Sequence, residues 1–149
     1  MARRILIVLV LGVFALAIGA NPAAAHPDGN GDEGCTPGFW KNHPDAWPIS
    51  TGTTLEDVFD VPDEFGLDSA TFLDAMEFKG GPTLADMASL LLRQAAAGYL
   101  AALHPDVDYP RIASEVVSIT NAALASGRRA RMERVKNRFD GFNNLGCPL

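Results

Sequence analysis

The segment from Thr83 to Leu103 constrains the fold more than any other part of the sequence. Thr83 is followed three residues later by Asp86, which is the pattern of a helix-capping box. Apolar residues then lie on nearly every side of the predicted helix. Asp86, Arg93 and Gln94 interrupt this stretch, which argues against a membrane-spanning helix. Such a helix belongs at the centre of a domain, with neighbours packed on several of its faces.

Weaker helical patterns lie on both sides of this central segment. We predict helices over residues 54–61, from Asp68 or Ser69 up to the break at 79–82, over 110–127, and over about 128–139. No stretch of residues 26–149 alternates convincingly between polar and apolar side chains, as a half-buried strand does. The sequence therefore predicts an all-α fold: a compact bundle of about three main helices with short helices and an N-terminal motif loop, closed by one disulfide.

The N-terminal residues have the pattern of an export signal. Arg3 and Arg4 precede an apolar run over residues 5–18, and small alanines follow at 23–25. The run is shorter than the ~20 residues that cross a bilayer, which argues against the alternative of an uncleaved membrane anchor. We predict a signal peptide over 1–25 cleaved near Ala25, a flexible lead-in over 26–34 and a helical domain over 35–149. The mature protein would be secreted, either extracellular or periplasmic.

Charge excludes some classes of partner. The net charge is −6, and without Arg3 and Arg4 the basic side chains fall to 10 against 18 acidic ones, a net charge of −8. A strongly acidic chain disfavours nucleic acid and anionic membranes as partners. Six basic side chains gather within 128–138, and we interpret them as a solvated face or as a complement to the acidic half of the same domain.

Two cysteines remain after removal of the signal peptide, Cys35 and Cys147. An exported chain meets oxidising conditions, and two cysteines allow only one intramolecular pairing. We therefore predict a Cys35–Cys147 disulfide that ties the two ends of the domain together. An intermolecular bridge and a bound metal are the alternatives, but no CxxC pair or suitably spaced histidine supports a zinc site. We predict no metal and no cofactor.

The stretch CTPGFWKNHPDAW, residues 35–47, has the highest density of chemically distinctive residues. In one interpretation its aromatic rings pack against the helical core beside the disulfide, while its polar residues bond to nearby backbone. In the other it forms a rigid aromatic and polar platform for a glycan or another extracellular protein. The candidate ligand-binding residues are then Phe39, Trp40, Lys41, Asn42, His43 and Trp47.

Catalytic motifs are absent from the sequence. It contains no Gly-x-Ser-x-Gly, no His-Glu-x-x-His and no glycine-rich phosphate loop. Asp28, Asn30 and Asp32 begin like a calcium loop, but the glycine and glutamate that such a loop requires later are missing. His43 with Asp45 or His104 is the best basis for a small hydrolase-like or metal-assisted enzyme. We keep this enzyme as the alternative and assign no catalytic residue.

The motif at 35–47 is similar to the signature of a family of small exported bacterial domains, marked by C-T-x-G-[FY]-W-K-N-H. The similarity continues through LLLRQAAAGYLAALHPDVDYP at 90–110 and the closing NNLGCPL at 143–149, and so covers nearly all of the mature chain. The resemblance implies pairing of Cys35 with Cys147. It also implies that WKNH has a role that the whole family shares, either in folding or in function. We expect a secreted structural or interaction module whose candidate binding surface lies at residues 39–47.

Overall fold

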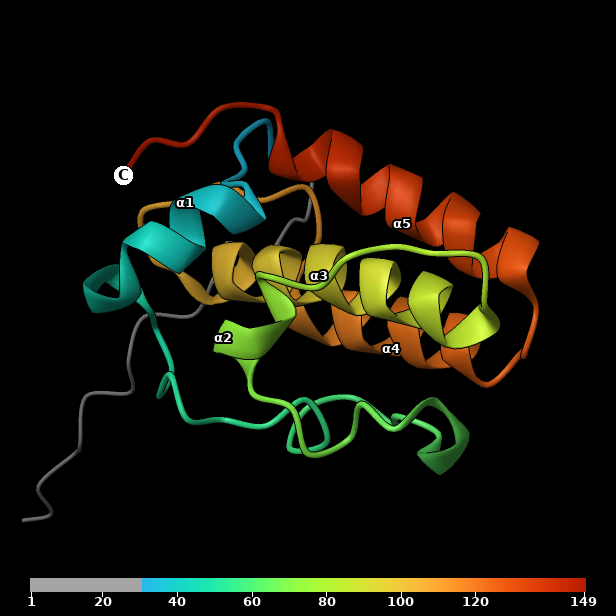
Figure 1. The fold of residues 1–149 in the computed structure, drawn as a ribbon. Helices are drawn as coiled ribbons and strands as arrows, with labels where there is room; N and C mark the ends of the chain where they lie inside the picture. Colours follow the sequence, from blue (N-terminus) through green and yellow to red (C-terminus); the bar gives the residue numbers. More distant parts are fainter. Residues whose placement is uncertain (1–30) are drawn as a thin grey trace, which may run out of the picture.

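The computed structural model describes residues 31–149, so the predicted signal peptide and most of the predicted lead-in lie outside the described residues. The described part contains five α-helices, two 3₁₀ turns and no β-strand (Figure 1), which confirms the all-α fold. In chain order these elements are α1 (Pro37–Asn42), η1 (Pro44–Ala46), η2 (Asp63–Phe65), α2 (Phe72–Ala75), α3 (Leu84–Leu103), α4 (Ala113–Leu124) and α5 (Arg129–Asn143).

The predicted central helix is confirmed as α3. It lies in the middle of the molecule, and α1, α2, α4 and α5 all pack against it (Figure 1). Its capping box is complete, because Thr83 N donates to Asp86 Oδ2 at 2.8 Å and Asp86 N donates to Thr83 Oγ1 at 3.1 Å. No helix within residues 31–149 is long and apolar enough to cross a membrane.

A buried polar network joins α3 to the C-terminal part of α5. Tyr109 Oη donates to Asn143 Oδ1 at 2.9 Å, and Asn143 Nδ2 donates to Gln94 Oε1 at 2.8 Å. Gly98 leaves the space that Tyr109 needs, because a Cβ atom at this position would lie 2.5 Å from Tyr109 Oη. Burial also raises the pKa of Tyr109 well above its ordinary value.

The predicted helix over 54–61 is wrong. Its cap forms, since Asp57 N donates to Thr54 Oγ1 at 3.3 Å and Thr54 N donates to Asp57 Oδ2 at 2.8 Å. However, the chain makes only turns here, even though Phe59 N donates to Leu55 O at 2.8 Å. Pro62 ends the segment, because a proline disfavours helical geometry in the residue before it, and so short a segment holds a helix only where tertiary contacts favour one.

The next short helix is present but starts later than predicted. Thr71, and neither Asp68 nor Ser69, is the cap of α2, and it forms a complete capping box with Asp74. Phe72 and Ala75 of this helix are fully buried, so the short turn still anchors its segment against the core.

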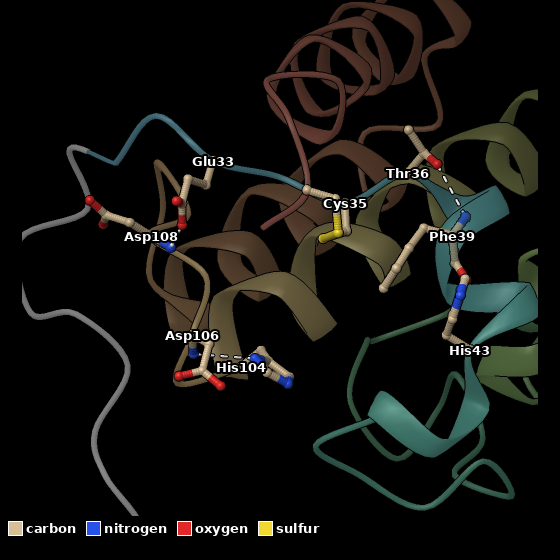
Figure 2. The surroundings of a disulfide bond; sticks show 9 residues. Glu33, Cys35, Thr36, Phe39, His43, His104, Asp106 and Asp108 are labelled. Atoms are coloured by element: carbon tan, nitrogen blue, oxygen red, sulfur yellow. Dashed lines mark hydrogen bonds between the residues drawn. A yellow bond between two sulfur atoms is a disulfide. The ribbon is translucent and has the colours of Figure 1, made fainter. Parts of the chain in front are cut away.

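The two ends of the described chain meet beside the predicted disulfide, which is confirmed (Figure 2). Cys35 and Cys147 are 112 positions apart in the sequence, yet their Cα atoms are 4.5 Å apart. Gly34 N donates to Gly146 O at 2.9 Å, and Glu33 N donates to Asp108 O at 3.0 Å. Residues 33 and 34, which we expected in the flexible lead-in, are therefore bonded to the domain.

Candidate functional site

The motif segment is helical, which corrects the expectation of a loop. Residues 37–42 form α1, and η1 follows directly. Thr36 accepts a hydrogen bond from Phe39 N at 3.1 Å, and Pro37 occupies the first helical position. Both residues are typical of a helix start. The pair Thr36-Pro37 was therefore the signal in the sequence that could have predicted this helix.

Trp40 is the buried anchor of α1. Its side chain is 0% exposed, and its ring lies against the edge of Phe39, with the two centroids 5.3 Å apart. The ring of His104, at the end of α3, lies 6.1 Å away between centroids. Trp40 cannot stack on a ligand at the surface in this position. Trp40, one of the six candidate ligand-binding residues, therefore belongs to the core.

Trp47 is half-buried and closes the end of α1. Its Nε1 donates to Trp40 O at 2.8 Å. Trp40 O also accepts from the backbone N of His43 at 3.3 Å, so the indole adds a second and shorter bond at the end of the helix. The partly buried ring also packs against the core. Trp47 therefore holds the motif together while part of its ring stays accessible.

The polar side chains of WKNH face solvent. Lys41 Nζ lies 2.6 Å from Glu77 Oε1, an exposed ion pair that links α1 to the residues just after α2. Asn42 Nδ2 donates to Gly38 O at 2.8 Å. Each side chain therefore has a structural partner as well as an exposed position.

His43 forms a fixed pair with Phe39. The two rings are stacked with centroids 4.3 Å apart and an angle of 15° between their planes. Nδ1 of His43 also lies 2.9 Å from Phe39 O. Because a carbonyl oxygen only accepts hydrogen bonds, Nδ1 carries the proton, and Nε2 of the neutral ring is left as an acceptor. The imidazole is thus oriented by its own helix while its edge remains exposed.

Neither histidine in the described part of the chain is hydrogen-bonded to a carboxylate side chain. His43 bonds to backbone there and not to Asp45 or another carboxylate. His104 Nδ1 accepts from the Asp106 backbone N at 3.2 Å (Figure 2). No group of three or more histidine, cysteine, aspartate or glutamate side chains within residues 31–149 is placed to hold a metal ion.

A shallow depression of about 490 Å³ lies elsewhere on the molecule. It is lined by Glu56, Phe59, Asp60, Val61, Pro62 and Ala125. None of the candidate residues of the motif belongs to it. No local sequence pattern predicts this depression, because residues 56–62 lie beside Ala125, the residue after α4, only in the folded chain.

Comparison with known proteins gives no match to a protein-family model, a curated protein or a solved structure. The resemblance of the motif to a family of exported domains therefore stays a prediction.

Proposed function

We propose that this protein is exported and acts as a small extracellular or periplasmic interaction module, a member of the family that its motif resembles. Its partner is a glycan or another extracellular protein, bound through the outer side of α1. The observation that carries the proposal is the difference in solvent exposure between neighbouring residues of WKNH. Trp40 is buried, whereas Lys41, Asn42 and His43 directly after it are exposed.

Two features support export. The first residues have the charge and hydropathy pattern of a signal peptide, with small alanines before the proposed cleavage point. The Cys35–Cys147 bond is the second feature, because structural disulfides persist in oxidising compartments and are rare in the cytosol. Each feature depends on a different part of the chain, and both agree on a location outside the cytoplasm.

The exposed side of α1 supports a binding role. The Phe39–His43 stack presents a planar edge, and the Lys41 ammonium and the half-buried Trp47 ring lie on the same short segment. Aromatic faces combined with a few fixed polar groups are typical of ligand sites. Because the backbone bonds at His43 and Trp47 already hold both rings, binding would cost little additional ordering.

No contact among the described residues favours the alternative of a hydrolase-like or metal-assisted enzyme. A general base needs a second titratable group or a bound water in a concave site. The depression at residues 56–62 and 125 is lined by none of the motif residues. The contacts of His43 therefore support a binding surface at α1 more than an acid–base site.

The proposal can be tested in a binding experiment with the oxidised domain, residues 26–149. Its binding is measured to a panel of immobilised glycans and to the surface of intact producing cells. We expect His43→Ala and Lys41→Ala to weaken binding by about tenfold or more while melting close to the parent, since hot-spot truncations exceed 1.4 kcal/mol. Glu133→Ala is the matched control, an exposed residue on α5, and should bind like the parent. Binding that is absent, or equal in all variants, contradicts the interaction module. Recovery of the full chain from the cytosol with free thiols contradicts export.

A further inference from the structure

Three arginines form a stripe on the outer face of α5. Arg131, Arg134 and Arg138 are all exposed and follow the helical spacing i, i+3 and i+7. The face of α5 that packs on the domain carries the buried Met132 and Phe139. Within residues 31–149 the structure gives one ion pair, between Lys41 and Glu77, so none of these arginines is paired with a described carboxylate. We call these three residues the arginine stripe.

The depression at residues 56–62 has the opposite character. Its apolar lining is the partly exposed Pro62 above the buried Phe59 and Val61, and its charge comes from the exposed Glu56 and Asp60. Asn121 holds Asp60 in place, since Asn121 Nδ2 donates to Asp60 Oδ2 at 2.7 Å and Asp60 N donates to Asn121 Oδ1 at 3.1 Å.

This lining suits an arginine side chain. The aliphatic stem of arginine packs well on apolar surface, and its planar guanidinium donates to carboxylates in pairs. Glu56 is exposed, and its side chain makes no hydrogen bond to another described residue, so its carboxylate is free to accept.

The arginine stripe is not paired with the carboxylates of the depression within one molecule, because the one ion pair among residues 31–149 joins Lys41 to Glu77. The α5 helix and the segment before α2 lie on opposite sides of the layer formed by α3 and α4 (Figure 1). Every copy of the chain therefore presents an unpaired basic stripe and a carboxylate-lined depression at separate places on its surface. This arrangement is complementary between copies, although the charges are not paired within a copy.

We propose that copies of this protein associate head to tail, with the arginine stripe of one molecule docked on the depression of the next. A second copy is the partner we choose, because the same chain supplies the complementary depression with Glu56 and Asp60, whereas the net charge of −6 disfavours a nucleic acid or another polyanion. The two contacting surfaces differ, so the interface is heterologous and adds molecules in an open series unless the rotation closes a ring. It is separate from the surface at α1.

Sedimentation velocity of the oxidised domain at rising protein concentration tests this association at about 20 mM and about 500 mM salt. We expect concentration-dependent oligomers at low salt and a dissociation constant raised by about tenfold or more at high salt, since several exposed ion pairs would be screened. Triple reversal R131E/R134E/R138E should leave a monomer, and so should E56K/D60N. Because E115K/D106N changes the net charge as much as E56K/D60N does, it is the matched control and should associate like the parent. Its lysine lies about 15 Å along α4 from Ala125, at 1.5 Å per residue.

Mixing the two monomeric variants separates a lost interface from a damaged fold. The intact stripe of E56K/D60N faces the intact depression of R131E/R134E/R138E, so the mixture should contain a heterodimer that neither variant forms alone. A parent that stays monomeric at low salt overturns the proposal. Oligomers that survive high salt, or that both variants still form, overturn it as well. Two variants that melt like the parent but fail to pair on mixing also refute it.

Discussion

Nε1 of Trp47 lies 2.8 Å from the carbonyl oxygen of Trp40 and donates a hydrogen bond to it. The second tryptophan of the motif therefore closes the helix that the first one anchors in the core. This bond connects the two interpretations of the motif. It fixes the backbone around WKNH, and it leaves the polar side chains of that segment on the outside.

Replacement of Trp40 by alanine should be severely destabilising. The side chain is fully buried, and truncation of a core tryptophan costs about 3–5 kcal/mol of unfolding free energy. Trp47→Phe keeps a ring but removes the indole donor, and should cost about 1 kcal/mol. Urea unfolding of the oxidised domain measures both values. A Trp40→Ala protein with the parent's midpoint would show that the core position of this ring is wrong.

The exposed residues of the same motif should behave differently. Lys41 makes an exposed ion pair with Glu77, and such pairs contribute about 0–1 kcal/mol, so Lys41→Ala should change stability by no more than that. His43→Ala should cost about 1 kcal/mol through loss of the bond to Phe39 O. Thermal unfolding beside Trp40→Ala gives the comparison. If all three variants melt far below the parent, the whole motif is structural and the binding surface lies elsewhere.

The sequence was most informative where a local pattern and the packing agree. Thr83 and Asp86 cap a segment that is apolar on most sides, and the helix forms as predicted because both the cap and the core favour it. Over 54–61 the cap formed, but a single turn buries Leu55 and Phe59 without a helix. For so short a segment, tertiary contacts decide the outcome, and these contacts are not visible in its sequence.

Acid should destabilise the domain through its capping carboxylates. Hydrogen bonds from Thr54, Thr71 and Thr83 lower the pKa of Asp57, Asp74 and Asp86, respectively, below the ordinary value of 3.8. Because the folded-state pKa is the lower one, the stabilisation is present above pH 3.8 and is lost as the pH falls through the folded-state values.

Melting temperatures between pH 6 and pH 2 check this prediction. The parent should melt at a nearly constant temperature down to about pH 5 and then progressively lower. A D74N/D86N variant should melt below the parent near neutral pH, and its further decrease in acid should be smaller. An equal decrease in both proteins would assign the acid sensitivity to other groups.

Gly98→Ala should disturb the network at the centre of the domain. The added methyl would lie 2.5 Å from Tyr109 Oη, so the ring has to move and its bond to Asn143 is strained. We expect a loss of about 1–3 kcal/mol, the usual cost of overpacking a core. Tyr109→Phe removes the same bond without the clash. If the Gly98→Ala variant is as stable as the parent, Tyr109 does not lie as close to the backbone of Gly98 as the structure places it.

Removal of the disulfide should lower the stability of the domain, mainly because the unfolded chain gains conformational freedom. In the chain-entropy model, a loop of this length contributes about 4–5 kcal/mol, which is comparable to the whole stability of many small domains. A Cys35→Ala/Cys147→Ala variant should therefore unfold at a much lower urea concentration than the oxidised parent. The parent measured in a thiol reductant should match the variant, and a difference between these two would point to packing of the cysteine side chains.

The candidate site was harder to predict than the fold. Nothing local distinguishes Trp40, which is fully buried, from Trp47, which is half-buried, because the difference arises from the position of α1 on α3. The depression between residues 56–62 and Ala125 also depends on segments that are distant in the sequence. The arginine spacing on α5 was visible from the sequence, whereas its lack of partners within the described residues was not.

The covalent link between the two ends also determines how the domain responds to force. Tension applied to the chain before Cys35 and after Cys147 passes through the sulfur–sulfur bond between them. The 111 residues enclosed by this bond carry none of that load, so α3 and the helices packed on it are shielded from stretching. A domain built in this way keeps its surfaces intact when it is pulled from both ends, and it extends a tether by no more than the short distance across the linked cysteines.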